Sequence, residues 1–288
     1  GVRLVGSEMC IRDRFITGAS QGLGLEFIAQ LLQAGHNVAA TSRTLAGLEK
    51  AAGVHPNLLP LEVDLINEDS VATAINSTII KFGTIDVVVN NAGYGQLGAL
   101  EELTDAEART NFDVNVFGAL NVIRKVLPQL RKQGSGHIIN IASIAGVSGN
   151  FPGWGIYCAT KFAMAGFTES LAAEVAEFGI KTTLVLPGYF RTNFLKGSSL
   201  AIAKTPIAEY TAVRQSEQAH TESIDGNQGG DPVKGVAAII ETVEAGKAPL
   251  YLFLGADAVG LAEQKISLLT ADINDNRALS ISTGYSAS

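Results

Sequence analysis

Two residues that could move a proton, Tyr157 and Lys161, stand four positions apart in a helical pattern that runs from Gly155 to Phe178. This spacing places both side chains on one face of a helix. An ammonium group beside a phenol favours the phenolate, and so lowers the pKa of the phenol from about 10 toward neutrality. Such a pair could protonate a carbonyl oxygen or deprotonate an alcohol. The same spacing also arises by chance, so it needs support from other residues.

A glycine-rich turn, Thr17 to Gly24 (TGASQGLG), stands between a strand-like and a helical segment. Glycines here allow a tight turn, let backbone N–H groups approach a pyrophosphate, and let helix and strand pack closely. The start of the helix adds a partial positive charge that favours phosphate. No Lys-Ser or Lys-Thr follows, as a P-loop would require. We predict a dinucleotide site formed by Gly18, Ser20, Gln21, Gly22, Leu23 and Gly24.

The end of the next strand indicates which dinucleotide is preferred. The segment from His36 to Thr41 is followed by Ser42 and Arg43, at the position where NAD-binding folds place Asp or Glu. A guanidinium can pair with a 2′-phosphate, which a carboxylate would repel. We therefore predict NADP(H) rather than NAD(H). The alternative is that Arg43 is an ordinary solvated residue of the surface.

Two later segments complete the predicted cofactor site. Asp64, followed by Leu65, closes the third strand and could accept a hydrogen bond from an adenine amino group, or simply cap a helix or turn. Asn91, Ala92 and Gly93 end the fourth strand with small residues, where a cofactor needs close backbone approach. Alone, these three residues could also form a turn.

Short β-branched segments alternate with helical patterns along the chain. Most are continuously apolar, as expected for strands buried on both faces of a parallel sheet. The predicted strands are Phe15–Thr17, Asn37–Thr41, Leu58–Val63, Asp86–Asn90, His137–Ala142, Lys181–Leu186 and Leu250–Leu254. We predict an α/β fold, a doubly wound, Rossmann-type parallel sheet of about seven strands with helices on both faces. Ser143 follows the fifth strand, at the edge where such sheets bind ligands.

The sequence also predicts several helix boundaries. Gly35 should end the helix after the glycine turn, Thr104 or Asp105 should cap a long helix, and Asp231 with Pro232 should begin a late one. Two regions break the alternation. Residues 190–230 read as a substrate lid, or as a solvated connection, and residues 255–288 as a C-terminal extension within a single domain of residues 15–288.

The start of the chain does not suit a buried strand. Residues 11–16 include three charges, and burying unpaired charge is costly. Residues 1–14 resemble an adapter-derived or mis-read sequence. We interpret them as a non-native-looking leader and assign no functional residue to them.

The composition of the 288 residues excludes several classes of protein. With 47% hydrophobic and 17% charged residues, the chain is not disordered. A net charge of −7 disfavours binding to nucleic acid. Two cysteines give no disulfide framework, and no apolar run approaches the roughly 18 residues of a membrane span. We expect a cytoplasmic protein with a small-molecule substrate, no membrane partner and no metal ion.

Together these residues resemble the short-chain dehydrogenase/reductase family, in its single-domain, NADP-preferring branch. The resemblance runs from about Phe15 to Leu254. It rests on motifs in the order of the family: TGASQGLG, NNAG, Asn115, Asn140-Ile-Ala-Ser143, Tyr157-x-x-x-Lys161 and Pro187-Gly188-x-x-x-Thr192. Several motifs in order are a specific signal, unlike any one of them alone.

The resemblance implies a role for each of these residues. Tyr157 is the proton donor or acceptor, and Ser143 holds the substrate oxygen. Lys161 binds the nicotinamide ribose and lowers the pKa of Tyr157, while Asn115 holds a water that links Lys161 to solvent. Further contacts to the cofactor are expected from Pro187, Gly188 and Thr192.

The implied reaction is hydride transfer between a nicotinamide and a carbonyl or secondary alcohol. With its long lid and extra C-terminal helix, the chain resembles reductases that are related to hydroxysteroid and retinol enzymes. We therefore expect the substrate to be an apolar ketone or aldehyde. An apolar pocket could be lined by Phe151, Trp154, Tyr189, Phe190 and Phe194. The alternatives are a non-catalytic NADP-binding sensor or regulator, and a 3-ketoacyl-type reductase. The resemblance also implies a homodimer, paired through the helices near 105–131 and 155–178.

Overall fold

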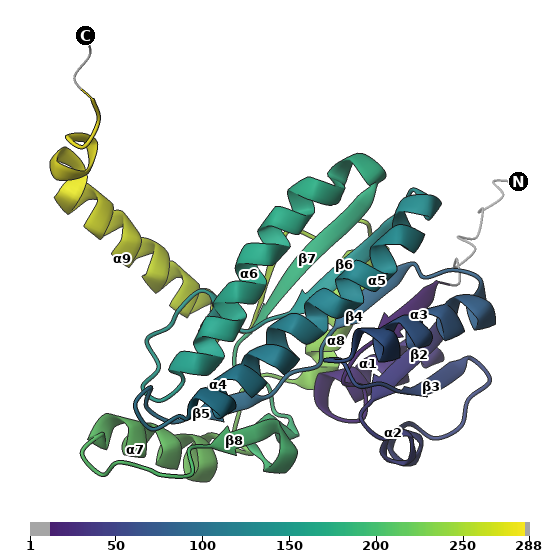
Figure 1. Cartoon of the computed structure of the whole chain (residues 1–288), viewed down its shortest axis with the longest axis horizontal. Coiled ribbons are helices and arrows are strands. Elements are labelled where there is room, and N and C mark those ends of the chain that lie inside the picture. Colours follow the sequence, from purple (N-terminus) through teal and green to yellow (C-terminus); the bar gives the residue numbers. More distant parts are fainter. Residues whose placement is uncertain (1–11, 286–288) are drawn as a thin grey trace, which may run out of the picture.

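Residues 12–285 are described by a computed structural model, in which a seven-stranded sheet lies between two layers of helices (Figure 1). All neighbouring strands are parallel, in the order β3-β2-β1-β4-β6-β7-β9. The strands are β1 (Asp13–Ile16), β2 (Asn37–Ser42), β3 (Leu58–Glu62), β4 (Val87–Asn90), β6 (Gly136–Ile141), β7 (Ile180–Pro187) and β9 (Tyr251–Leu254). The predicted doubly wound, Rossmann-type fold is confirmed.

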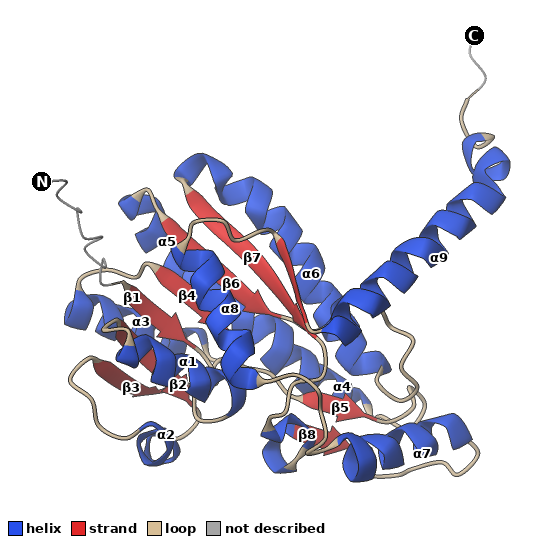
Figure 2. Ribbon diagram, turned by 180° about the vertical axis from the view of Figure 1, so that it is seen from behind, coloured by secondary structure: helices blue, strands red, loops and turns tan. Residues whose placement is uncertain are grey.

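Helices cover both faces of this sheet. The α-helices of the described residues are α1 (Gly22–Gln33), α2 (Leu45–Ala52), α3 (Glu68–Phe82), α4 (Asp105–Phe112), α5 (Gly118–Gln133), α6 (Gly155–Val175), α7 (Thr211–Gln218), α8 (Pro232–Glu244) and α9 (Ala256–Ile281). Helices α3, α5 and α6 pack on one face, while α1 and α8 pack on the other (Figures 1 and 2).

Neighbouring residues of one strand belong to different hydrophobic cores. Phe15 of β1 packs among the side chains of α3 and α5, whereas Ile16 packs among those of α1 and α8. Successive side chains of a strand point to opposite faces of the sheet. Because both faces are covered, both residues must be apolar. This explains why the strands are recognisable as continuous apolar runs.

The first strand begins earlier than expected. Asp13 and Arg14, which we assigned to the leader, are its first two residues, and both are buried. Arg14 forms an ion pair with Glu244 of α8, and Asp13 accepts a hydrogen bond of 2.9 Å from Asn37. The charges therefore have partners, which offsets the cost that we expected for unpaired charge. The rest of the predicted leader, residues 1–11, lies outside the described residues.

The order of the strands places the predicted site segments together. From β1 the chain runs outward through β2 to β3 and then returns to β4, on the other side of β1. Such a reversal opens a crevice at the carboxyl ends of the strands. The glycine turn follows β1, Asn91 follows β4, and Ser143 follows β6, so all three reach this edge.

A small second sheet attaches the predicted lid to the main body. Strand β5 (Gly95–Leu97) pairs in parallel with β8 (Leu200–Ile202), which lies in the region from 190 to 230. Helix α7 and a π-helical turn (Ala219–Ile224) follow in the same region. We did not predict β5 or β8, because three residues are too few for a periodic pattern.

Helix α9 begins against the body and then extends away from it (Figure 2). Ala258 and Ala262 in its first turns are buried, whereas the side chains beyond them are largely exposed. Among the residues that the structure describes, no helix has both the length and the apolar character needed to cross a membrane.

Candidate active site

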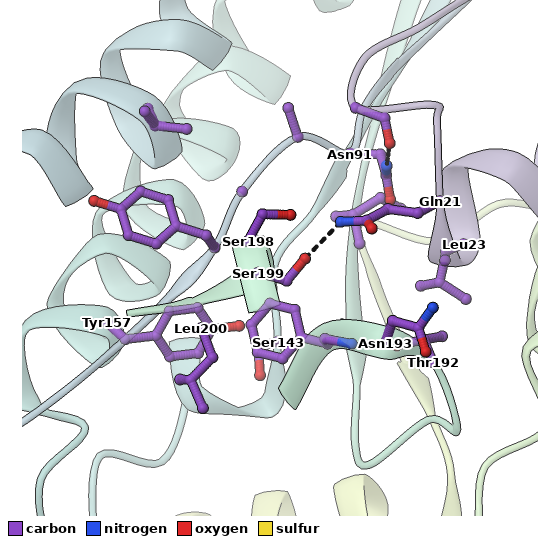
Figure 3. A pocket seen from close by; sticks show the side chains of 18 of the residues that line it. Gln21, Leu23, Asn91, Ser143, Tyr157, Thr192, Asn193, Ser198, Ser199 and Leu200 are labelled. Atoms are coloured by element: carbon purple, nitrogen blue, oxygen red, sulfur yellow. Dashed lines mark hydrogen bonds between the residues drawn. The ribbon is translucent and has the colours of Figure 1, made fainter. Parts of the chain in front are cut away.

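A cavity of about 660 Å³ lies at the carboxyl edge of the sheet and gathers most of the predicted site residues (Figure 3). Of these, the lining includes Gly18, Ser20, Gln21, Gly22, Leu23, Ser42, Arg43, Asp64, Leu65, Asn91, Ala92, Gly93, Ser143, Tyr157, Lys161, Pro187, Gly188 and Thr192. Two predicted residues, Gly24 and Asn115, do not line the cavity.

The glycine turn is held so closely that side chains would not fit. Gly18 has a φ of +63°, and a Cβ there would lie 2.7 Å from Cα of Ala92. A Cβ at Gly24 would lie 2.5 Å from the carbonyl oxygen of Gly18. The side-chain amide of Asn91 also donates hydrogen bonds of 3.0 Å to the carbonyls of Thr17 and Gly18. The result is a rigid, open cradle at the start of α1, which suits a pyrophosphate.

Arg43 stands beside a recess at the rim of this cradle. Its side chain is exposed, and it lines a smaller recess of about 380 Å³ with Ser20, Gln21, Ser42, Thr44 and Ser198. These residues supply hydroxyl groups, an amide and one positive charge, and none of the carboxylates in the described part of the chain lines the recess. That chemistry suits a phosphate group.

Asp64 serves a local turn as well as the cavity. Its Oδ1 accepts a hydrogen bond of 3.2 Å from the backbone N–H of Ile66, and its own N–H donates to Ser70. The residue is exposed and lines the cavity. The turn thus fixes the orientation of a carboxylate that could still accept a hydrogen bond from an adenine amino group.

Tyr157, Ser143 and Lys161 line the same cavity. Tyr157 is 7% exposed, and burial raises the pKa of its phenol, although a hydrogen bond with Ser143 opposes this effect. The Ser143 Oγ also accepts a hydrogen bond of 3.1 Å from the N–H of Ala145. Lys161 donates a hydrogen bond of 3.0 Å to the carbonyl of Ile141, and burial lowers its pKa to about 8.

The direction of the Tyr157 shift differs from our expectation. We expected the ammonium of Lys161 to lower the pKa of the phenol, but the Lys161 Nζ lies 5.7 Å from the centre of the ring, and burial dominates. A raised pKa keeps the phenol protonated near neutral pH. In this state the side chain is a proton donor, as reduction of a carbonyl requires.

Asn115 is fully buried in a π-helical turn, Asp113–Phe117, which interrupts the long helix between α4 and α5. Its Oδ1 accepts a hydrogen bond of 3.0 Å from the N–H of Tyr94, and its Nδ2 donates to Thr160 at 3.1 Å. A Cβ at Gly93 would lie 3.1 Å from Asn115 Oδ1 and 3.6 Å from Lys161 Nζ. Asn115 therefore supports the wall beside Lys161, and π-helical turns often mark functional positions.

Two contacts escaped the sequence analysis because they join distant segments. Asp257, in the first turn of α9, accepts a hydrogen bond of 2.7 Å from the N–H of Tyr189 and thereby holds the turn at Gly188. Gln21 of the glycine turn donates a hydrogen bond of 2.6 Å to Ser199 in the lid (Figure 3). An acidic residue at the start of a helix was a readable signal for the first contact. No local pattern indicated the second.

The other end of the cavity is aromatic. All five of the predicted aromatic residues line it, namely Phe151, Trp154, Tyr189, Phe190 and Phe194. The rings of Trp154 and Tyr157 meet edge to face, with their centres 5.6 Å apart. His220 and Gln228 of the lid also line this end, and neither was predicted.

Comparison with known proteins identifies the family. A family model described as short chain dehydrogenase matches residues 14–202. The chain belongs to the short-chain dehydrogenase/reductase family. Oxidoreductase BOA17 of Botryotinia fuckeliana is 35% identical over 272 residues, which cover 93% of this chain and 98% of that protein. The 3-ketodihydrosphingosine reductase of Bacteroides thetaiotaomicron is 42% identical over 186 residues, or 65% of this chain and 66% of that protein.

Solved structures of dehydrogenases agree with this assignment. A short-chain dehydrogenase of Streptomyces avermitilis superposes with a TM-score of 0.87 at 34% identity, covering 96% of this chain and all of that one. One from Burkholderia cenocepacia in complex with NADP gives 0.73 at 26% identity, with coverages of 93% and 98%. One from Burkholderia phymatum in complex with NAD gives 0.74 at 24% identity, with coverages of 91% and 96%. The protein is thus an oxidoreductase of this family.

Proposed function

We propose that the protein is an NADP(H)-dependent reductase of an apolar ketone or aldehyde, and that it can oxidise the corresponding secondary alcohol. The observation that carries this proposal is that Tyr157, Ser143 and Lys161 line one cavity together with the glycine cradle. A nicotinamide cofactor bound in the cradle would supply the hydride that the chain itself cannot provide.

The residues of the chain orient the substrate and supply the proton. The hydroxyls of Ser143 and Tyr157 donate hydrogen bonds to the substrate oxygen, where negative charge develops during reduction. Tyr157 then gives its proton to that oxygen. Lys161, with a pKa of about 8, is protonated at neutral pH and favours the phenolate that remains. Asn115, in the π-helical turn, bonds to Tyr94 and Thr160 and so supports the wall beside Lys161.

Arg43 supports NADP(H) as the cofactor. Its exposed guanidinium borders a recess with several hydroxyl groups and no carboxylate, as expected for a site that accepts a 2′-phosphate. The solved dehydrogenases include one in complex with NADP and one in complex with NAD, so NAD(H) is the alternative.

The aromatic end of the cavity supports an apolar substrate. The rings that line it include Trp154, directly before α6, Tyr189, shortly after β7, and Phe194 of the lid. The similar reductase of Bacteroides thetaiotaomicron is named for a 3-ketodihydrosphingosine, which fits a carbonyl group on a largely apolar body. A 3-ketoacyl-type reductase remains the second candidate, because a structure with that name has a TM-score of 0.70 at 25% identity.

We further propose a cytoplasmic homodimer that pairs through α5 and α6. Phe117, directly before α5, is 50% exposed and Phe162 of α6 is 41% exposed. Exposed aromatic side chains on adjoining helices suit an interface between identical subunits.

The test is consumption of NADPH with a panel of ketones and aldehydes. We expect turnover by the natural protein and a decrease in kcat of about 10²–10⁴-fold in Tyr157→Phe, because the general acid is lost while the ring remains. Tyr210→Phe is the matched control, since Tyr210 lies in the lid and does not line the cavity. NADPH binding without turnover of any compound would contradict the proposal and favour a sensor.

A further inference from the structure

A buried amide in the lid faces the cavity without a partner. Gln228 is 3% exposed and lines the cavity, yet neither its Nε2 nor its Oε1 has a hydrogen-bond partner among the described residues. The backbone carbonyl of Gln228 accepts a hydrogen bond of 3.2 Å from Arg191, so the segment is anchored. Buried amides normally find partners, because burying one without them costs free energy.

The indole N–H of Trp154 likewise lacks a hydrogen-bond partner among the described residues. Trp154 is 5% exposed and lines the cavity, and its Nε1 has no partner within residues 12–285. The ring is fixed between Tyr157, at 5.6 Å, and His220, at 4.8 Å between ring centres. These two ring contacts limit how far the indole can turn its N–H toward another partner.

The neighbouring polar side chains are already satisfied. His220 Nδ1 lies 2.7 Å from the carbonyl of Ser216, which can only accept, so Nδ1 carries the proton. Nε2 of the neutral ring is therefore an acceptor, and it takes the hydroxyl proton of Tyr189 at 2.9 Å. Tyr189 and His220 consequently leave the needs of Gln228 and Trp154 unmet.

Within residues 12–285, no Asp, Glu, Lys or Arg side chain lines this end of the cavity. The Asp, Glu, Lys and Arg side chains that line the cavity are Arg43, Asp64 and Lys161. The first two follow β2 and β3 at the cofactor end, and Lys161 adjoins Tyr157. The guanidinium of Arg191 bonds to the backbone carbonyl of Gln228 but does not line the cavity, so burying a carboxylate or an ammonium of the substrate at this end would be costly.

We propose that Gln228 and Trp154 form a second polar subsite, which binds a neutral hydroxyl or carbonyl group on the substrate other than the carbonyl that is reduced. This inference rests on the proposed function and narrows its substrate class to apolar carbonyl compounds with a second, uncharged hydrogen-bonding group.

The test compares substrates that differ only at the far end. The probes are octan-2-one, 8-hydroxyoctan-2-one and 7-oxooctanoate, with the ten- and twelve-carbon members of each series. At the best chain length we expect the hydroxyl compound to exceed the plain ketone in kcat/KM by about tenfold or more, because it satisfies a buried amide. The carboxylate should be the poorest of the three.

Substitutions of Gln228 and Trp154 test whether these residues cause the preference for the hydroxyl compound. Gln228→Met keeps the size of the side chain and removes its hydrogen bonds, and it should reduce the hydroxyl-to-ketone ratio of kcat/KM by about tenfold, mainly through KM. Trp154→Phe should reduce the same ratio by about fivefold. Gln218→Met is the control, because Gln218 is exposed in α7 and bonds to Glu222. A ratio near one in the natural protein, or an equal ratio in Gln228→Met, would overturn the proposal.

Thermal unfolding provides a readout that does not depend on turnover. Removing an unpartnered buried amide should raise the Tm of Gln228→Met by about 3–6 °C. A lower Tm would show that the amide has a structural partner, and would overturn the proposal. If no carbonyl compound is turned over, the proposed function fails separately. The subsite is then tested by the increase in Tm that 8-hydroxyoctan-2-one causes, which should be larger in the natural protein than in Gln228→Met.

Discussion

The two ends of the cavity are built in different ways. The cofactor end consists of backbone and small side chains in short loops directly after β1 and β4, where added atoms would collide. The substrate end includes large buried side chains, such as Trp154, directly before α6, and Gln228 of the lid. Local sequence therefore determines the first end, whereas tertiary packing determines the second. Substitutions at one end should therefore change cofactor binding, and substitutions at the other end should change substrate binding.

The largest effect is expected in the cradle. In Gly24→Ala the new Cβ would lie 2.5 Å from the carbonyl of Gly18, so the turn must shift. We expect the Kd for NADPH, measured by fluorescence titration, to rise by about a hundredfold. Gly260→Ala is the control, because a Cβ at Gly260 meets nothing within 4 Å. Equal affinities in the two variants would show that the cradle is not the binding element.

The next effect concerns cofactor choice. Arg43→Asp should raise the Kd for NADPH by about 10–100-fold and should not weaken binding of NADH, because a carboxylate repels the 2′-phosphate that the guanidinium binds. Lys132→Asp changes the charge equally on an exposed residue that does not line the cavity. If NADPH affinity were the same in both variants, the assignment of Arg43 would be wrong.

A smaller effect should be confined to the substrate end. Glu102 has a fully buried side chain that accepts hydrogen bonds from the N–H of Ala99 and of Ile207, both at 2.7 Å, and pairs with Arg214 of α7. Glu102→Gln should raise the KM for the carbonyl substrate by about fivefold, since it loosens the lid, and leave the Kd for NADPH within about twofold. Glu209→Gln, at an exposed position in the lid, controls for charge. An equal change in both constants would contradict the division into two ends.

The smallest effect is a pH dependence of stability. The pKa of Lys161 is lowered by burial from 10.5 to about 8, so above pH 8 the folded chain loses a proton that the unfolded chain still binds. The free energy of unfolding contributed by this group therefore rises with pH from about 8 to 10, and is lowest below pH 8. Urea unfolding should show this slope in the natural protein and a weaker slope in Lys161→Met. Parallel curves would mean that Lys161 is not desolvated.

The sequence alone predicts those parts of the structure that depend on residues close together in the chain. Most strands of the main sheet contain an apolar run because both faces are covered, and the glycine turn is recognisable because its backbone excludes side chains. The N-cap at Asp231 followed by Pro232 likewise follows from local chemistry, since its side chain accepts from the N–H groups of Val233 and Lys234.

Features that depend on contacts between distant segments escaped prediction. Strands β5 and β8 pair across about a hundred residues, and each is too short to show a pattern. The raised pKa of Tyr157 depends on how completely the fold buries the phenol, which the spacing to Lys161 does not reveal. Arg14 was judged too costly to bury because its partner, Glu244, lies at the other end of the chain.

The most direct test of the account is the fate of the hydride. The protein would be incubated with an apolar ketone and with NADPH that carries deuterium on one face of nicotinamide C4, and the alcohol would be analysed by mass spectrometry. We predict one deuterium on the former carbonyl carbon from one of the two C4-labelled forms, and none from the other. An alcohol without deuterium from either form, or NADPH that binds and is never consumed, would contradict the account.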